Sequence, residues 1–342
     1  MREPLYTAEE ARRAEEGHDV EELMERAGLA VAREVATRFP LARRIAVVCG
    51  GGSNGGDGRI AARILREEGR DAVETTDVAD ADVIVDALFG TGFHGEPRPE
   101  AAETIERINA AGVPVVAVDV PSGVDASSGE IAGVAVEATV TVTFHGRKVG
   151  LAVAPGYFRA GEVVVAEIGL PPLETEHALV TSAILERVPR KRLQDSKYTA
   201  GSVLVVGGAP GLTGAACLAA AAAFRADAGY VAVAVPEASL PVVEAQLLEP
   251  VKATWEQALE RAERARALAI GPGLGRSAEA KRLRDELLAA GDHALVLDAD
   301  ALDGLEPGPW GTRAVLTPHA GELGRLLGEE SSWVDEHRLE AV

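Results

Sequence analysis

The sequence predicts an α/β protein of two domains, each with a mostly parallel sheet covered by helices. The chain has 342 residues, which is long for one ordinary domain and suits two. Short apolar runs alternate with helical segments, the pattern of a parallel sheet. A stretch rich in proline and charge interrupts this alternation from about Leu170, and the alternation resumes at Ser202. We therefore expect a domain at residues 1–172, a linker at 173–196 and a second domain at 197–342.

The first domain is predicted to begin with two helices and to continue with strands. Residues 7–17 form the first predicted helix, and Asp19 with Glu22 is a capping-box-like start for a second helix, from Val20 to about Phe39. Strands are predicted in RIAVVCG, DVIVDALFG, VPVVAVDVPSG, EATVTVTF and GEVVVAEIGL. Because ligands of open α/β sheets bind outside the carboxyl ends of the strands, we expect a site at these ends.

The second domain is predicted from another series of the same kind. Its strands lie in SVLVVGG, YVAVAVP, ALAIGPGLG, ALVLDADAL and RAVLTPHAGE, with a helix near Thr213–Asp227. The two halves share this style of folding but no common motif.

The composition disfavours several classes of partner. A net charge of −20 makes nucleic acids and anionic membranes poor partners. No apolar run is long enough to span a membrane, and the charged N-terminus lacks the apolar core of a signal peptide. The two cysteines, Cys49 and Cys217, lie in apolar segments, as reduced thiols of cytoplasmic proteins do. We therefore expect a cytoplasmic protein.

A glycine-rich loop joins the first predicted strand to a helix from about Asp57 to Glu68. The segment CGGGSNGGDG contains the spacing G-x-G-x-x-G at Gly50, Gly52 and Gly55. Glycines let the backbone approach a phosphate, and the N–H groups at a helix start favour an anion. Backbone N–H groups of this kind can bind a phosphate even in a very acidic protein, because they need no basic side chains. The alternative is a glycine-rich turn that binds nothing.

Two more strand ends carry polar side chains. Asp86 ends one strand and precedes a second glycine loop, and Asp119 ends another strand shortly before Ser122. Asn54, Asp86 and Ser122 offer hard oxygen ligands, which suit an alkali or alkaline-earth cation. The alternative is that Asp86 and Asp119 only cap the turns that follow them.

Four spaced motifs resemble the NAD(P)H-hydrate epimerase family and together cover residues 1–170. They are LYTAEEARRAEE…EELMERAGLAVA, CGGGSNGGDGRIAARIL, VDALFGTGFHGE and AVDVPSGVDASSGE. The resemblance implies a Rossmann-like αβα sandwich. It also implies a small-molecule substrate, NADH or NADPH hydrated at C6 of the nicotinamide ring, whose R and S forms the family interconverts.

The resemblance also implies roles for individual residues. Asn54, Asp86 and Ser122 would bind a potassium ion, and Asp119 would contact the substrate near the reacting centre. Our own hypothesis is that Asp119 is the catalytic residue. One set of substrate contacts would be Ser53, Asn54, Gly55, Gly56 and Asp57. The other set would be Gly90, Thr91, Gly92, Phe93, His94, Gly95 and Glu96. We expect Asp119 to assist loss and return of the C6 hydroxyl through an iminium-like ring that its charge stabilises.

The sequence departs from the family's pattern in two places. Ser53 stands where the family commonly has an asparagine. The segment GRDAVETTDVADADVIVD lacks the lysine that some members place there and that is proposed as a catalytic partner. The partner of Asp119 is therefore left open.

The second half is similar to the NAD(P)H-hydrate dehydratase family, in SKYTAGSVLVVGGAPGLTGAACLAAAAAFRADAGYVAVAVP, AIGPGLG, VLDADAL and VLTPHAGELGRLLG. The resemblance implies a ribokinase-like fold that uses ADP or ATP with magnesium to dehydrate the S hydrate. It places substrate contacts at Ala215, Gly273 and His319. The alternative for His319 is a helix-capping or surface histidine.

The later glycine-rich GTGD-like segment of that family, with its catalytic aspartate, is not found in this sequence. GTGF at Gly90–Phe93 belongs to the first half. We therefore expect the ribokinase-like domain to be incomplete at its C-terminus and residues 1–342 not to dehydrate the hydrate.

Three other functions stay open from the residues alone. The first half can be a binding scaffold without catalysis, or an NAD-dependent dehydrogenase with Asp71 or Glu74 near the second strand. The second half can be a small-molecule kinase. The resemblance also leaves room for a homo-oligomer, because epimerase relatives often dimerise.

Overall fold

The computed structural model of the chain describes residues 2–188, 190, 192–196, 199–306, 308 and 313–342. Positions 189 and 191 of the predicted linker, and 197–198, 307 and 309–312 of the predicted second domain, lie outside the described residues. The chain divides into two compact units, which are described separately. The first unit is Met1–Ile184 with Asp335–Val342, and the second is Leu185–Val334.

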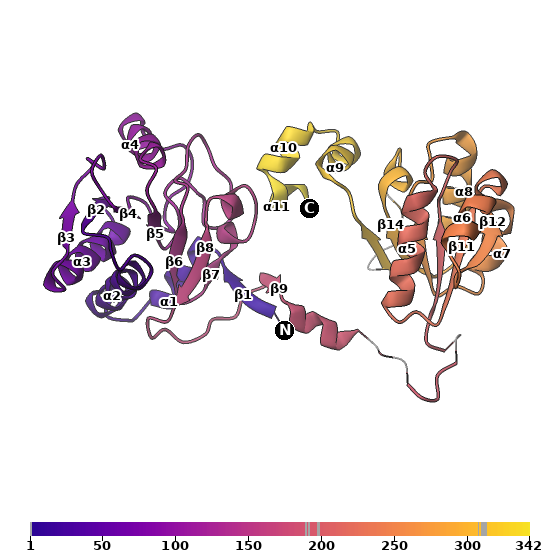
Figure 1. Cartoon of the computed structure of the whole chain (residues 1–342), viewed down its shortest axis with the longest axis horizontal. Helices are drawn as coiled ribbons and strands as arrows, with labels where there is room; N and C mark the ends of the chain where they lie inside the picture. The colour runs from indigo at the N-terminus through magenta and orange to yellow at the C-terminus, as the bar shows by residue number, and fades with distance from the viewer. Residues whose placement is uncertain (1, 189, 191, 197–198, 307, 309–312) are drawn as a thin grey trace. The chain divides into compact units, whose positions relative to one another are not determined.

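The first unit is built on a parallel sheet with the strand order β3-β2-β4-β5-β6-β8 (Figure 1). Its strands are β2 (Arg44–Cys49), β3 (Asp71–Glu74), β4 (Val83–Ala87), β5 (Val115–Val118), β6 (Val140–Phe144) and β8 (Glu162–Ala166). All five strands predicted in this half are present. In these strands successive side chains point to opposite faces, and apolar residues on both faces explain the continuous apolar runs.

Helices cover both faces of this sheet. Helices α2 (Val20–Arg38) and α3 (Ser53–Glu67) pack over Ile45 and Val47, while α4 (Pro99–Ala110) packs over Ala46 and Val48 on the opposite face. This is an αβα sandwich. The carboxyl ends of β2, β4 and β5 lie at one edge of it, next to each other.

The helix starts are set by local signals. Thr7 and Glu10 form a capping box for α1 (Ala8–Glu15), and Asp19 caps α2 by accepting bonds from the N–H groups of Glu21 and Glu22. Helix α3 begins at Ser53, four residues before the predicted start at Asp57. Residues 53–57 are therefore its first turn and not part of a loop.

A small three-stranded sheet in the first unit was not predicted. Its order is β7-β1-β9, made of β1 (Arg2–Tyr6), β7 (Arg147–Lys148) and β9 (Ala178–Val180). Strand β1 pairs in parallel with β7 and antiparallel with β9. Strand β9 lies inside the predicted linker, and the domain bounds drawn from the sequence stay a prediction.

The second unit has a parallel sheet with the order β12-β11-β10-β13-β14-β15. The strands are β10 (Ser202–Val206), β11 (Tyr230–Val235), β12 (Val251–Thr254), β13 (Ala267–Ile270), β14 (Ala294–Leu297) and β15 (Ala314–Leu316). Only β12 was not predicted. The predicted helix near Thr213–Asp227 is α5 (Thr213–Arg225).

Helices lie on both faces of the second sheet as well. Helices α5 and α6 (Leu240–Gln246) pack on one face, and α7 (Ala258–Ala262) and α8 (Ala278–Ala289) pack on the other. Helices α9 (Ala320–Leu327) and α10 (Ser331–Glu336) follow β15 in the chain, and the last helix, α11 (Arg338–Ala341), belongs to the first unit. No helix among the described residues is both long and apolar enough to cross a bilayer.

Candidate active site

A cleft of about 690 Å³ opens at the carboxyl edge of the first sheet. Helix α1, the glycine-rich segment, the loop after β4 and the ends of β5 and β6 all contribute to its walls. The lining residues are Ala8, Glu9, Arg12, Glu15, Gly51, Gly52, Ser53, Asn54, Asp57, Leu88, Phe89, Gly90, Thr91, Gly92, Phe93, Asp119 and Phe144. The predicted strand ends therefore meet in one cavity.

The glycine-rich segment forms the first wall of the cleft. Two of its glycines are required because backbone oxygens of other residues lie very close to them. A Cβ on Gly50 would lie 2.0 Å from the carbonyl oxygen of Leu88, and one on Gly55 would lie 2.0 Å from that of Gly50. Gly52 caps α3 without a side-chain hydrogen bond. The first N–H groups of α3 are consequently open to an anion, as in other phosphate sites at helix starts.

Asn54, Asp86 and Ser122 converge beside the loop that follows β4. The Asn54 amide donates to the carbonyl of Phe89 (2.7 Å), and the N–H of Phe89 donates to Ser122 Oγ (2.8 Å). Ser122 donates to Asp86 through Oγ (2.6 Å) and through its N–H (2.8 Å). Asp86 also accepts from the N–H of Leu88 (3.3 Å), so the predicted turn-capping role is present too.

Asp86 is a buried carboxyl without an ion-pair partner among the described residues. It is 0% exposed, and burial raises its pKa to about 6 although Ser122 and Leu88 hydrogen-bond it. A nearby cation would favour its ionised form. Asn54 Oδ1, the Asp86 carboxylate and Ser122 Oγ form an all-oxygen donor set, which fits an alkali or alkaline-earth ion.

Asp119 lies at the end of β5 in an unusual conformation. Its φ of 66° is in the left-handed region, which is rare for residues other than glycine and is common at functional sites. Its Oδ1 accepts a bond from Thr143 Oγ1 (3.0 Å) and one from Lys148 Nζ (2.6 Å). Lys148 Nζ also donates to Thr143 Oγ1 (3.1 Å) and to the carbonyl of Phe144 (2.9 Å).

Two further carboxyl groups face the same space. Burial raises the pKa of Asp57 to about 8, and the charges of Asp119 and Glu15 add to the effect while Lys148 opposes it. The pKa of Glu15 is raised by burial and by Asp119. The cleft therefore contains carboxyl groups in different protonation environments.

The second glycine loop divides into two parts. Gly90, Thr91, Gly92 and Phe93 line the cleft, and the Phe93 ring stacks on Phe89 with centroids 4.6 Å apart. A Cβ on Gly90 would lie 2.9 Å from Asn54 Cγ, so this loop packs directly on the first wall. His94, Gly95 and Glu96 are exposed and lie outside the lining, as do Gly55 and Gly56.

In the second unit, the three predicted contacts follow β10, β13 and β15, of which only β10 and β13 are neighbours in the sheet. The loops after β10 and β13 touch, because Ala209 N–H donates to the carbonyl of Gly273 (2.7 Å). Ala215 is exposed in the first turn of α5. His319 is exposed after β15 and caps α9 by accepting from the N–H of Gly321. The capping alternative for His319 is thus confirmed, and its substrate contact stays a prediction.

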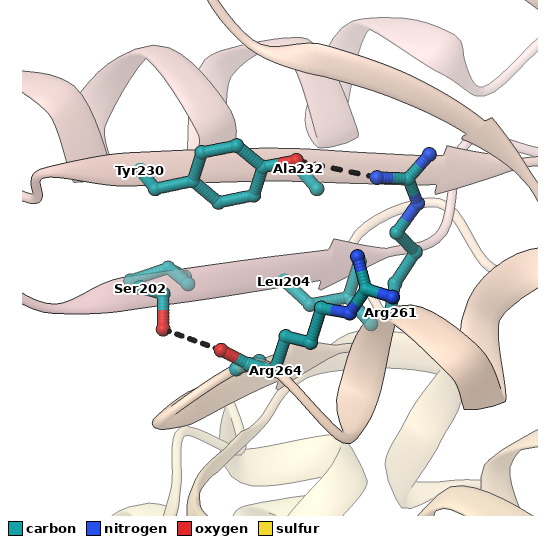
Figure 2. A pocket seen from close by; sticks show the side chains of 8 residues that line it. Ser202, Leu204, Tyr230, Ala232, Arg261 and Arg264 are labelled. Atoms are coloured by element: carbon teal, nitrogen blue, oxygen red, sulfur yellow. Dashed lines mark hydrogen bonds between the residues drawn. The ribbon is translucent and has the colours of Figure 1, made fainter. Parts of the chain in front are cut away.

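A small cavity of about 50 Å³ also lies in the second unit (Figure 2). Figure 2 shows Ser202 bonded to the carbonyl of Arg264, and Tyr230 bonded to Arg261. Ser202 and Tyr230 are the first residues of β10 and β11, so this cavity is at the amino edge of the sheet. The predicted contacts are at the carboxyl edge, where ligands of such sheets bind.

Comparison with known proteins decides the family. Residues 20–76 and 68–150 match the family described as YjeF-related protein N-terminus, and residues 203–342 match the family NAD(P)H-hydrate dehydratase. The bifunctional NAD(P)H-hydrate repair enzyme of Moorella thermoacetica is 37% identical over 390 residues, covering 93% of this chain and 72% of that protein. The enzyme of the same name from Pyrobaculum aerophilum is 39% identical, with 94% and 74% covered.

The chain belongs to the family of bifunctional NAD(P)H-hydrate repair enzymes. A solved relative of its second half is the ADP/ATP-dependent NAD(P)H-hydrate dehydratase of Bacillus subtilis, co-crystallised with ATP and Mg²⁺. That structure is 30% identical and covers 46% of this chain and 59% of its own, with a TM-score of 0.39. The predicted family, the predicted α/β fold class and the predicted role in nicotinamide nucleotide repair are confirmed, and the scaffold, dehydrogenase and kinase alternatives are not favoured.

For a member of the NAD(P)H-hydrate repair family, Lys148 is the main residue that the sequence did not predict. The segment after the second strand contains no lysine, whereas the segment HGRKVG just after β6 supplies one that bonds Asp119. Lys148 is in β7, where it pairs with Tyr6 of β1, and its Nζ bonds Asp119 Oδ1. Its only sequence signal is its rarity, because the chain is acidic and its basic residues are mostly arginine.

Proposed function

We propose that the first unit interconverts the R and S forms of NADH and NADPH hydrated at C6, and that Asp119 is its catalytic residue. The observation that carries this proposal is the buried Lys148–Asp119 pair at the wall of a cleft of about 690 Å³. Lys148 Nζ donates a hydrogen bond to the Asp119 carboxyl group, and negative charge held in a partly buried site stabilises a cationic intermediate best.

Substrate binding relies on backbone groups in this proposal. Among the described residues, Arg12 is the one arginine or lysine that lines the cleft, and its guanidinium bonds Glu16. The N-terminus of α3 at Ser53 and Asn54 is therefore the better site for the pyrophosphate, with Gly51 and Gly52 allowing close approach. Thr91, Gly92 and Phe93 form the facing wall.

The reaction requires the C6–O bond to break and to form again on the other face of the ring. The ring nitrogen supplies the electron pair for C6=N as the hydroxyl leaves, and the ring becomes positively charged. The Asp119 carboxylate stabilises that charge. The left-handed backbone at Asp119 and its bonds to Thr143 and Lys148 fix the direction of the carboxylate.

We also assign a potassium site to Asn54, Asp86 and Ser122. Their donor atoms are all oxygens, and Asp86 is a buried carboxyl in need of positive charge. Potassium would neutralise Asp86 and hold the loop between Phe89 and Phe93 against α3. Asn54 and Ser122 already hydrogen-bond the backbone of Phe89. The residues proposed to bind the ion therefore also position the loop proposed to contact the substrate.

For the second unit, we propose that Ala215, Gly273 and His319 contact a hydrated nicotinamide nucleotide in a dehydratase reaction that uses ADP or ATP with magnesium. The small residues leave room beside the start of α5, where free N–H groups lie. The free cysteines Cys49 and Cys217 suit a reducing compartment, and we assign the protein to the cytoplasm.

The direct test mixes the pure R hydrate of NADH with the protein and follows the S form by chromatography, with and without potassium. We expect conversion well above the rate without protein, and faster conversion with potassium. No acceleration over the protein-free rate would refute the epimerase assignment. An equal rate in potassium and in a large organic cation would refute the potassium site alone.

A further inference from the structure

The cleft contains more carboxyl groups than its cationic side chains can neutralise. Glu15, Asp57 and Asp119 all line it, and Lys148 bonds only one of them, Asp119. The three donors of the ammonium are used by Asp119, Thr143 and the carbonyl of Phe144, so none is left for Asp57 or Glu15. The charge of Asp119 raises the pKa of both Asp57 and Glu15, because a neighbouring like charge disfavours the ionised form of a carboxyl group.

We propose that Asp57 is a second catalytic residue, a general acid that gives its proton to the C6 hydroxyl while ionised Asp119 stabilises the ring. This inference rests on the proposed function of the first unit. It assigns opposite protonation states to two aspartates that line the same cleft, one on α3 and one just after β5.

The surroundings of Asp57 favour its protonated form. The residue is 8% exposed, and no described side chain or backbone group donates a hydrogen bond to its carboxyl group. It is one turn inside α3, which starts at Ser53, and the stabilising field of a helix N-terminus fades within that turn.

The charged groups that face Asp57 come from three other elements. Asp119 and Lys148 come from the strand ends, and Glu15 comes from α1 together with Glu9 and Arg12. Arg12 is bonded to Glu16. Burial and the two carboxylates outweigh Lys148 and raise the pKa of Asp57.

The proposed step balances in atoms and charge. The Asp57 carboxyl transfers its proton to the C6 oxygen, the C6–O bond breaks, and water leaves while the ring nitrogen forms C6=N. Asp57 is then a carboxylate and the ring is a cation beside Asp119. Water adds to the other face of C6, its electron pair forms the new C6–O bond, and its proton returns to Asp57.

The kinetic test compares Asp57→Asn with the unaltered chain, using the R hydrate of NADH over a range of pH. In the unaltered chain we expect kcat to fall as pH rises through about 8. Asp57→Asn should lower kcat by about 10²-fold or more, change KM little and remove the alkaline fall. Glu67→Gln, the same charge change on the exposed far part of α3, should leave the pH profile as it was.

A second measurement tests Asp57 without using activity. Infrared titration should show the carbonyl stretch of a protonated carboxylic acid at neutral pH, absent in Asp57→Asn and retained in Asp119→Asn. If Asp57 is ionised at neutral pH, or if Asp57→Asn raises KM and keeps kcat, the inference is overturned. If the unaltered chain epimerises nothing, the proposed function fails, and the infrared result still decides the state of Asp57.

Discussion

Lys148 Nζ lies 2.6 Å from Asp119 Oδ1, and the lysine side chain is only 4% exposed. Asp119 directly follows β5 and Lys148 is in β7, and the two residues are 29 positions apart. A buried ion pair has a large desolvation cost, which is repaid only when further hydrogen bonds satisfy both groups. Here Thr143 bonds both partners. The hydrogen bonds of Thr143 thus help to offset the desolvation cost of the Lys148–Asp119 pair.

Asp119→Asn is predicted to abolish epimerisation and to leave the fold intact. The amide oxygen can still accept bonds from Thr143 and Lys148, but the negative charge that stabilises the cationic ring is lost. Conversion of R to S hydrate measures the activity, and the thermal melting curve checks the fold. Near-normal turnover would remove Asp119 from the chemistry.

Lys148→Met is predicted to destabilise the first unit by about 3–5 kcal/mol, because it leaves Asp119 without its cation. In the double variant Lys148→Met with Asp119→Asn, the loss in free energy of unfolding should be smaller than the sum of the losses in the two single variants. All three tryptophans lie after residue 250, so fluorescence would report the second half. Hydrogen exchange within residues 1–184 is the appropriate measurement.

The control for that cycle is Arg44→Met, which breaks the exposed pair with Asp80. Exposed pairs contribute about 0–1 kcal/mol, so a small effect is expected. Strict additivity of the Lys148 and Asp119 changes would show that the two side chains do not interact.

Asp86→Asn is predicted to raise the potassium concentration for half-maximal epimerisation by about 10-fold or more, the usual cost of weakening a metal site. The cause is loss of the one charged ligand in the set. Asp77→Asn, an exposed change in the loop before β4, is the control. The same potassium dependence in both variants would argue against the site.

Gly55→Ala is predicted to distort the glycine loop, while Gly51→Ala should be tolerated by the fold. A Cβ on Gly55 would meet the backbone oxygen of Gly50 at 2.0 Å, whereas one on Gly51 has nothing within 4 Å. Backbone cannot rotate away as a side chain can. The melting temperature should therefore fall by several degrees for Gly55→Ala alone, and equal values would contradict this packing.

Asp57→Asn is predicted to stabilise the folded chain at alkaline pH. The pKa of Asp57 is about 8 when folded, above its usual 3.8, so the folded state binds a proton that the unfolded state has released. Stability is thus lost as pH rises from about 4 to 8. Asparagine does not titrate and avoids this loss, so at alkaline pH the free energy of unfolding of the variant should exceed that of the unaltered chain by more than about 1 kcal/mol. Hydrogen exchange should show no advantage of the variant in acid.

Much of the fold was predictable because its signals are local. Apolar runs such as RIAVVCG and SVLVVGG, each followed by glycine and a helix, predict parallel strands in both halves. The carboxyl ends of parallel strands share one edge, so the presence of Asn54 and Asp119 in one cleft follows from the same pattern. Asp86 bonds Ser122 and is not among the lining residues of that cleft. The start of α3 was misplaced because its first turn, SNGG, resembles a loop in composition.

The sequence by itself determined the fold class, the family and the aspartates at the strand ends, because strand alternation and glycine motifs act over short distances. Only the tertiary structure decided which cation meets Asp119 and which carboxyl groups share its cleft. Strand β7 has only two residues and pairs with β1, which is more than 140 positions away in the chain. No local sequence pattern therefore predicts that Lys148 lies beside Asp119. Protonation depends on burial and on neighbouring charges, and both arise only when distant segments pack together.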